Sequence, residues 1–288
     1  MFNYLLYRLG QFIALHTPLR IAYFIASIIS DLHYLAAYKD HRRVKANLKA
    51  IFPEKSDSQI RGIRLRMSRN FAKYLVDFFR FEKIDKEYIK KNIRIENLDY
   101  FTQALSKGKG AIALTAHLGN WELGGVVIAL LGYPFWAVAL EHKDKRVNEF
   151  FNFQRESKGM KVIPLSKAVR ACLNLLKENK IVALVGDRDF SQKGIVLDFF
   201  GKPTCLPEGP AAFSLKTGAP IVPGFMLRNK DDTFTLTIEK PIEFTPCGDK
   251  NKDLKELASR YARVIEGYIR RYPDQWYMFR AFWKDARL

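Results

Sequence analysis

Cysteine is scarce in this chain, and no two cysteines lie close together in the sequence. The 288 residues include three, Cys172, Cys205 and Cys247, which lie far apart and form no CxxC motif. Such scattered cysteines argue against a disulfide framework and against a zinc site, and they favour a reducing compartment. The 17 glycines and 12 prolines are too few for a collagen-like or low-complexity chain. With 48% hydrophobic residues, the chain can bury a substantial core.

Acidic residues are outnumbered by basic ones. Lysine and arginine total 48 against 30 aspartates and glutamates, a formal net charge of +18. This excess favours anionic partners: nucleic acid, anionic lipid or a phosphorylated substrate. Aromatic residues make up 14% of the chain, and a surface rich in cations and aromatics suits a membrane interface at least as well as DNA. A basic nucleic-acid-binding protein is the alternative, but no zinc spacing or RNA-binding aromatic signature supports it. We expect anionic membrane lipid as a partner and no nucleic acid.

The chain has no long uninterrupted apolar run. Its most apolar window, residues 21–38, still contains Asp31 and His33. A membrane span needs about 20 apolar residues with few charges, so we expect an interfacial helix pair here rather than a span. A buried amphipathic helix of a soluble fold is the alternative. No small-residue cleavage site closes the stretch, which argues against a signal peptide. Basic residues follow at once and predict that this flank faces the cytoplasm: Lys39, Arg42, Arg43 and Lys45.

Short apolar runs alternate with helical patterns beyond about residue 90. We expect strands at 111–116, 135–140, 162–164, 181–186, 196–199, 221–225 and 234–239. We expect helices at 59–81, 121–131, 145–158, 167–179, 208–217 and 252–272. This alternation predicts an α/β fold in which helices flank a largely parallel sheet. Ligands of such sheets bind beyond the carboxyl ends of the strands, so the loops after residues 116 and 186 are the first candidate sites.

A histidine ends the first of these strands, and a glutamate follows five residues later. On one continuous helix, His117 and Glu122 would point about 140° apart, so they meet only if the chain turns between them. Gly119 permits that turn, and Asn120 is a preferred helix cap. Glu122 would then accept the Nδ1 proton of His117 and leave Nε2 as a base, as in part of a catalytic triad. A purely structural pair is the alternative.

No serine nucleophile accompanies the histidine, because the chain contains no GxSxG motif. The nucleophile would then be a hydroxyl of the substrate, which His117 deprotonates directly. A thioester is a suitable electrophile. The pattern therefore indicates acyl transfer without a covalent enzyme intermediate.

Five further residues are candidates for substrate binding. Arg155 ends an aromatic-rich helix and could bind a phosphate or stabilise a thioester oxyanion; a surface arginine is the alternative. Arg188 could bind an anion and Asp187 could hold the site loops, with a solvated turn as the alternative. The backbone at Gly209 begins a helix and suits a phosphate, whereas Glu208 would repel one unless it binds a substrate hydroxyl or a cation. We expect no metal, because two carboxylates and an arginine make a poor metal cage.

The motifs together resemble those of a known family. His117-x4-Glu122 resembles the HX4(D/E) signature of bacterial glycerolipid and glycolipid acyltransferases. Further motifs recur in the same order in one family, the late lipid A acyltransferases of lauroyl and myristoyl type, with the related phosphatidylinositol mannoside acyltransferases. These motifs are Asn47-Leu48, Phe52-Pro53, Arg155-x3-Gly159, Asp187, VLDFFG at 196–201, Gly209-Pro-Ala, TGAP at 217–220 and Gln275-Trp276. The resemblance covers nearly the whole chain.

The resemblance implies a glycerol-phosphate-acyltransferase-like fold and a catalytic pair of His117 and Glu122, with Arg155 and Asp187 lining the site. It implies an acyl-carrier-protein or acyl-CoA thioester as co-substrate, with no other cofactor. It also implies a glycolipid acceptor, foremost a lipid A precursor, at the cytoplasmic face of the inner membrane. We accordingly divide the chain into an N-terminal membrane-associating helical segment, residues 1–45, and an acyltransferase domain, residues 46–288.

Two departures from the lipid A pattern leave the acceptor open. The sequence Gly186-Asp-Arg-Asp189 looks closer to the mannoside acyltransferases, and Pro207-Glu-Gly209 resembles a phosphate-binding block of lysophosphatidic acid acyltransferases. Another glycolipid or a lysophospholipid is therefore the alternative acceptor. A non-catalytic membrane-binding relative is a further alternative, against which the intact His117 and Glu122 argue.

Overall fold

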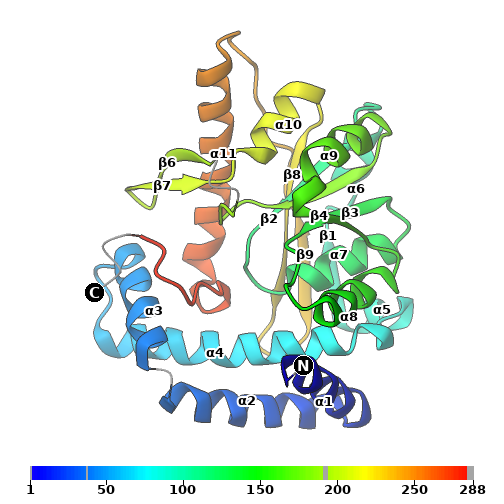
Figure 1. Cartoon of the computed structure of the whole chain (residues 1–288). Coiled ribbons are helices and arrows are strands. Elements are labelled where there is room, and N and C mark those ends of the chain that lie inside the picture. Colours follow the sequence, from blue (N-terminus) through cyan, green and yellow to red (C-terminus); the bar gives the residue numbers. More distant parts are fainter. Residues whose placement is uncertain (1, 37, 191–193, 284–288) are drawn as a thin grey trace.

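The centre of the molecule is a seven-stranded sheet flanked by helices (Figure 1). The computed structural model describes residues 2–36, 38–190 and 194–283. The strand order is β1-β9-β8-β2-β5-β3-β4. The strands are β1 (Ile93–Glu96), β2 (Ala111–Thr115), β3 (Phe135–Ala139), β4 (Lys161–Pro164), β5 (Ile181–Val185), β8 (Ile221–Arg228) and β9 (Phe234–Ile238). The predicted α/β class is confirmed.

Most neighbouring strands run in parallel, as the sequence predicts. β2 lies between β5 and β8 and is parallel to both, whereas β8 and β9 pair antiparallel. In the β2–β5 register, Thr115 lies opposite Val185. The two strands therefore end side by side, and the loops that follow them begin at the same edge of the sheet. This register positions the candidate site.

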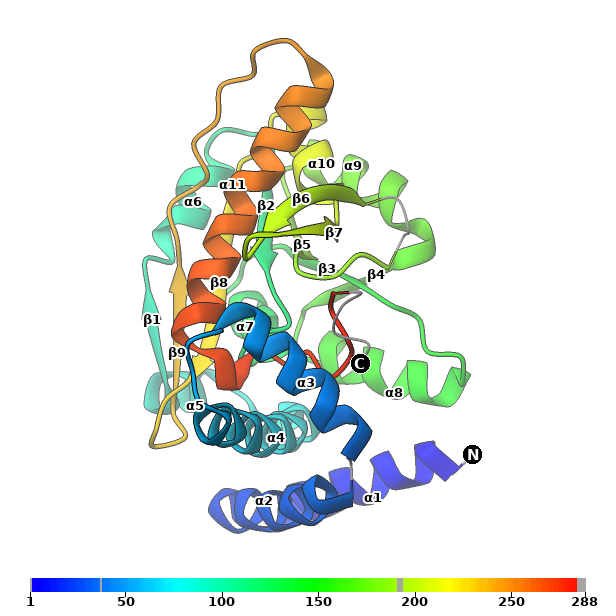
Figure 2. The same cartoon turned by 90° about the vertical axis from the view of Figure 1, so that its left-hand side faces the viewer.

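One predicted strand lies outside this sheet. Residues 196–199 belong to β6 (Ile195–Phe199), which forms a separate antiparallel hairpin with β7 (Lys202–Leu206). The hairpin packs on α11 (Lys250–Arg271), as Figure 2 shows. The sequence analysis missed β7, which contains a proline, and it also missed the four-residue strand β1.

The predicted helices are present with small shifts of their ends, and several helices were not predicted. The predicted ones are α4 (Asp57–Phe79), α7 (Trp121–Leu130), α8 (Lys145–Glu156), α9 (Ala168–Lys177), α10 (Gly209–Thr217) and α11. Ser56 caps α4 through a reciprocal pair of hydrogen bonds with Gln59. The additional helices are α3 (Tyr38–Ile51), α5 (Lys86–Asn92) and α6 (Asp99–Leu105).

The core lies on both faces of the sheet because side chains alternate along each strand. In β2, Ile112 and Leu114 pack with α9, α10 and α11 on one face. Ala111 and Ala113 pack with α6 and α7 on the other face. The small alanines leave room on the α7 face, where the candidate pocket lies.

Two N-terminal helices, α1 (Phe2–His16) and α2 (Leu19–Ala36), lie at the margin of the core, to which they contribute Ala14, Ala22 and Tyr23. In both views α2 runs beside α4, against which it packs (Figures 1 and 2). Its inward face buries Ala22, Tyr23 and Ser30, while large apolar residues on its outward face are exposed: Ile21, Phe24, Ile28, Ile29, Leu32 and Leu35. Helix α2 is also long and apolar enough to cross a membrane, by length and composition. Its exposure excludes the alternative of a buried helix in a soluble core.

Candidate active site

The loops after β2 and β5 bring His117 and Asp187 together. Nδ1 of His117 lies 2.8 Å from Oδ1 of Asp187, and the His117 backbone N–H donates to the same oxygen at 3.1 Å. A carboxylate can only accept a hydrogen bond, so Nδ1 carries the proton and Nε2 is left as a base. Thr115 and Val185 are paired in the β2–β5 register; His117 follows the first by two residues, and Asp187 follows the second by two residues. Strand pairing thus creates this contact between residues 70 positions apart.

Asp187 is fully buried, and protein donors occupy both of its carboxylate oxygens. Trp276 Nε1 donates to Oδ2 at 2.9 Å. Burial raises the pKa of the Asp187 carboxyl, but His117, Arg188 and the hydrogen bond from Trp276 outweigh it and lower the pKa to about 2. Asp187 is therefore ionised at neutral pH. These contacts confirm the expectation that Asp187 holds the loops of the site. Its hydrogen bond to the His117 imidazole was not expected from the sequence.

The turn between His117 and α7 has the features expected from the sequence. Gly119 has a φ of +62°, and an added Cβ would lie 2.1 Å from the Met226 carbonyl oxygen. Asn120 caps α7, since its Oδ1 accepts a hydrogen bond from the Leu123 backbone N–H. The expected glycine turn and asparagine cap are both confirmed.

A C-terminal segment holds this turn from the other side. The Tyr277 N–H donates to the His117 carbonyl at 2.9 Å, and the Gly119 N–H donates to the Gln275 carbonyl at 2.9 Å. Trp276, between them, is the donor to Asp187. The place of Gln275-Trp276 at the site was not expected from the sequence. An aromatic and amide pair far from the histidine carries no local signal of this contact.

The imidazole is partly exposed and lies among aromatic rings. The side chain of His117 is 17% exposed. The ring of Trp121 lies 5.1 Å from it in an edge arrangement, and Phe190 lies at 6.2 Å. Within the described part of the chain, no residue makes a hydrogen bond to Nε2 of His117. That nitrogen is thus available to a substrate hydroxyl.

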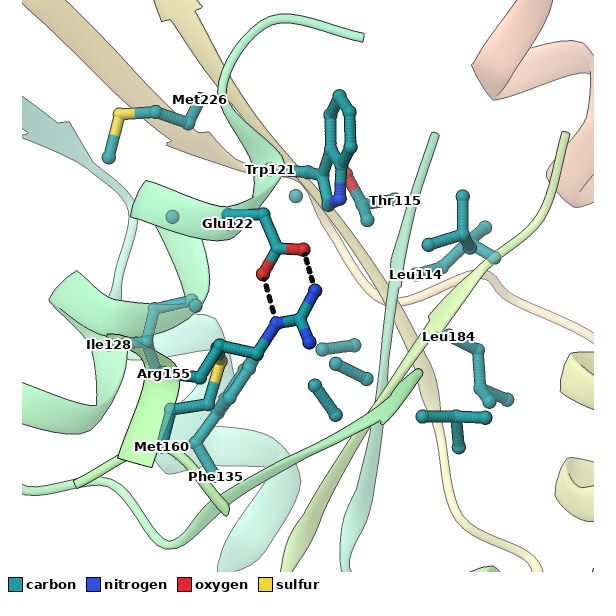
Figure 3. Close-up of a pocket in the computed structure, with 18 of the residues that line it drawn as sticks. Leu114, Thr115, Trp121, Glu122, Ile128, Phe135, Arg155, Met160, Leu184 and Met226 are labelled. Carbon is teal, nitrogen blue, oxygen red and sulfur yellow. Dashed lines mark hydrogen bonds and ion pairs between the residues drawn. The ribbon is translucent and has the colours of Figure 1, made fainter. Parts of the chain in front are cut away.

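Glu122 has a different partner from the one expected. Its carboxylate forms a bidentate ion pair with Arg155, with Nε to Oε2 at 2.8 Å and Nη2 to Oε1 at 2.5 Å (Figure 3). Both side chains are about nine-tenths buried. The expected hydrogen bond from His117 Nδ1 to Glu122 is wrong, because Nδ1 points to Asp187. Glu122 occupies the Nε and Nη2 edge of the Arg155 guanidinium, and Nη1 lies 3.4 Å from Asn152 Oδ1. Binding of a substrate anion by Arg155 stays a prediction.

This ion pair lies at the wall of an apolar pocket between α7 and the sheet (Figure 3). The pocket is lined by backbone and side chains of β2, β3, β5 and α7, with Met160 and Met226. It includes Thr115 and Trp121, which flank the turn that carries His117. Phe78 and Phe151 lie 5.9 Å from the Arg155 guanidinium, so aromatic rings also surround the charged pair. The pocket can accept an apolar group beside the turn that carries His117.

The remaining residues predicted to bind substrate are Arg188, Glu208 and Gly209. Arg188 Nη2 donates to the Tyr277 carbonyl, and its Nε is buried without a partner among the described residues. Burial lowers the pKa of the Arg188 guanidinium. Gly209 begins α10, and Glu208 precedes it without a side-chain hydrogen bond to the helix start. Within the described part of the chain, neither Glu208 nor Gly209 makes a hydrogen bond to His117.

The donors at this site do not suit a metal ion. Among residues 2–36, 38–190 and 194–283, no three His, Cys, Asp or Glu side chains come together as a metal site requires. The chemistry available is that of a histidine base, an ionised carboxylate behind it and an apolar pocket beside it.

The known proteins to which this chain is similar are acyltransferases. The family model described as bacterial lipid A biosynthesis acyltransferase matches residues 2–285. The chain belongs to this acyltransferase family. It is 30% identical over 218 residues to a phosphatidylinositol mannoside acyltransferase of Mycolicibacterium smegmatis, covering 74% of this chain and 70% of the relative. It is also 30% identical over 220 residues to a protein of that name from Mycobacterium tuberculosis, covering 74% and 68%.

The protein is thus an acyltransferase, as the motifs of the sequence predict. Family membership and the exposed apolar face of α2 both point to association with a membrane.

Proposed function

We propose that this acyltransferase moves a fatty acyl chain from a thioester to a hydroxyl of a glycolipid at a membrane surface. The observation that carries the proposal is the His117–Asp187 pair beside the apolar pocket. A base with a free Nε2 suits an alcohol nucleophile, and an apolar pocket suits an acyl chain. The family supports the same reaction class.

In this proposal, Nε2 of His117 takes the proton from the acceptor hydroxyl as that oxygen attacks the thioester carbonyl. Asp187 stabilises the imidazolium that forms and keeps Nδ1 protonated. The tetrahedral intermediate collapses to the ester as its C–S bond breaks, and the leaving sulfur takes up the proton that His117 returns and departs as a thiol. The enzyme ends the cycle unchanged and forms no acyl-enzyme bond.

Glu122 and Arg155 have a separate role in the proposal. Their bidentate pair links α7 to α8 at the wall of the pocket. We assign them to holding the pocket in place, with Glu122 fixed in the first turn of the helix that follows His117. Glu122 touches the pocket that would receive the acyl group, so it also remains a candidate catalytic residue.

The acyl donor in the proposal is an acyl carrier protein or acyl-CoA. Both present a thioester on a long flexible arm with phosphate groups, which suits a protein with a formal net charge of +18. Arg188 and the start of α10 at Gly209, with Glu208 beside it, are the candidate binding groups for the polar part of a substrate. No cofactor beyond the thioester is required by this chemistry.

A lipid A precursor is the first candidate acceptor, because the family model describes lipid A biosynthesis. A phosphatidylinositol-mannoside-like acceptor is the second candidate. The names of two similar proteins and the local sequence Gly186-Asp-Arg-Asp189 favour it. The cytoplasmic face of the inner membrane is the proposed location, on the basis of the basic residues that follow the apolar segment.

Lipid mass spectrometry tests the function. Lipids from cells with and without this gene would be compared, and purified protein would be assayed with acyl-carrier-protein and acyl-CoA donors. We expect a glycolipid lighter by one acyl chain in the cells without the gene, and its headgroup distinguishes the two acceptors. An unchanged lipid profile together with no transfer in vitro to either acceptor would refute the proposal.

A further inference from the structure

A buried polar cluster connects helix α2 to the active-site turn. Its centre is Asp77 of α4, which is 4% exposed. Tyr23 of α2 donates its hydroxyl to Oδ1 of Asp77, while Arg228 of β8 and Asn120 Nδ2 donate to Oδ2, the latter at 2.9 Å. The guanidinium of Arg228 also lies 4.8 Å from the Tyr23 ring. None of these side chains takes part in the reaction proposed above.

Asn120 connects this cluster to the turn that carries His117. Its Oδ1 caps α7 through the Leu123 N–H at 3.1 Å, and its backbone N–H donates to the Met226 carbonyl at 2.8 Å. The two ends of an amide side chain differ, because one accepts hydrogen bonds and the other donates them. The Asp77 carboxylate can only accept hydrogen bonds, so it binds the Nδ2 end of the Asn120 amide. The Oδ1 end of Asn120 then faces α7. The carboxylate therefore fixes the rotamer that caps the helix.

Tyr23 connects the cluster to a surface that is open to lipid. It lies on the inward face of α2, whose outward face exposes Phe24, Ile28 and Leu32 among other apolar residues. In water, those residues bury little area and stabilise the position of α2 only weakly. Inserted in the apolar part of a bilayer, each would contribute roughly 25 cal/mol per Å² of buried area. A membrane would thus add to the contacts that hold α2 on α4, such as the bidentate pair of Asp31 and Arg69, and would further restrict Tyr23.

We infer that Tyr23, Asp77 and Asn120 couple membrane attachment to the order of the active-site turn. A bilayer beneath α2 holds Tyr23 on Asp77, Asp77 fixes the Asn120 amide, and Asn120 caps the helix that follows His117. Tyr23 and Asp77 act as positioning residues in this scheme and do not touch a substrate. The inference rests on the proposed membrane association and extends it. It predicts an enzyme whose site is better ordered on lipid than in solution.

The chain offers a matched control for Tyr23. Tyr34 lies on the same helix α2, and its hydroxyl accepts a hydrogen bond from Arg64 of α4 at 3.1 Å. Tyr34→Phe therefore removes one hydroxyl and one hydrogen bond between the same two helices. It leaves the Asp77 cluster intact. A general loosening of α2 on α4 would affect both variants, whereas the coupling would affect Tyr23→Phe alone.

Hydrogen–deuterium exchange tests the coupling without any acyl donor or acceptor. The full chain would be compared with and without phosphatidylglycerol vesicles, with peptides covering residues 117–124 as the reporter. In the parent protein and in Tyr34→Phe, we expect vesicles to slow exchange of this segment. In Tyr23→Phe, bound to vesicles, the segment should exchange about 10-fold faster than in the parent, as loss of one hydrogen bond to a charged group implies.

Several results would overturn the inference. One such result is an exchange rate of residues 117–124 in the parent that vesicles leave unchanged. Another is an equal exchange rate of this segment in Tyr23→Phe and Tyr34→Phe. Absence of any vesicle binding in a sedimentation assay would remove the coupling and the proposed membrane association together. A protein that shows the exchange pattern but transfers no acyl chain would keep the coupling and refute the proposed reaction.

Discussion

Nδ1 of His117 lies 2.8 Å from Oδ1 of Asp187, and Trp276 holds the other oxygen of that carboxylate. The contact depends on two parallel strands that end side by side. It gives the acyltransferase a histidine with a fixed tautomer and an ionised partner.

Asp187→Asn tests the partner of the base. The variant keeps the shape of the side chain but removes its charge, and its amide can present a donor to Nδ1. We expect turnover to fall by at least about 10²-fold, because the tautomer and the imidazolium both lose their support. Acyl transfer by the purified protein would be measured at saturating donor. Thioester binding should stay near that of the parent.

Asp189→Asn is the matched control for this variant. Asp189 lies in the same loop, but its Oδ2 accepts from the Gly194 N–H at 3.0 Å rather than from His117. We expect Asp189→Asn to keep most of the activity. Equal losses in the two variants would show that the loop, and not the contact with His117, is what matters.

The depressed pKa of Asp187 predicts a pH window for stability. Its carboxyl titrates at about 2 in the folded protein, below the ordinary value of 3.8. A carboxyl with a lowered folded pKa stabilises the fold above its unfolded pKa, and this contribution is lost as pH falls toward the folded pKa. The free energy of unfolding of the parent, relative to Asp187→Asn, should therefore decline between about pH 4 and pH 2. Urea unfolding at several pH values measures it; a difference that stays constant over this range would contradict the lowered pKa.

Glu122→Gln tests the second ion pair. The change leaves the buried Arg155 guanidinium without its anionic partner, and breaking a buried pair costs about 3–5 kcal/mol. We expect a large loss in the free energy of unfolding and in activity. The double variant Glu122→Gln/Arg155→Met removes the unpaired charge and should recover part of the stability. A double variant less stable than Glu122→Gln would argue that the pair does not act as a unit.

The outward face of α2 predicts how the protein binds membranes. Leu32→Glu places a charge on this face, where Leu32 is 62% exposed. We expect weaker sedimentation with anionic vesicles, and we expect high salt to weaken binding of the parent only in part, because apolar burial is not screened. Val169→Glu is the control, since Val169 is 68% exposed on the separate helix α9. Equal binding by the parent and both variants would exclude α2 as the membrane contact.

Much of the fold could be predicted from local patterns. Apart from β7, the strands and helices between residues 111 and 271 were predicted from their apolar runs and patterns, and the turn at Gly119 and the cap at Asn120 follow from residue type alone. The strand predicted at 196–199 is present as β6, but its place in a separate hairpin with β7 was not predicted, because an apolar strand carries no mark of the sheet that it joins. The pairing of strands is a property of the whole fold.

The candidate site was predictable in its parts but not in its contacts. The loops after residues 116 and 186 were both expected to lie at the site, because strands of a parallel sheet share a carboxyl edge. His117 was nevertheless paired with Glu122, the nearest carboxylate in the sequence. The choice between Glu122 and Asp187 depends on the β2–β5 register and on the position of Arg155, which takes up the Glu122 carboxylate. Neither can be read from one sequence.

Double-mutant cycles on turnover test the central claim most directly. Six proteins are required: the parent, His117→Ala, Asp187→Asn, Glu122→Gln, and the double variants of His117→Ala with each carboxylate change, each confirmed as folded by circular dichroism. Groups that act as a unit show strongly non-additive effects. We predict that Asp187→Asn adds almost nothing to His117→Ala, whereas Glu122→Gln slows His117→Ala by about the factor that it costs the parent. The reverse pattern, in which Glu122→Gln adds nothing and Asp187→Asn adds its full effect, would contradict the account and make Glu122 the partner of the histidine.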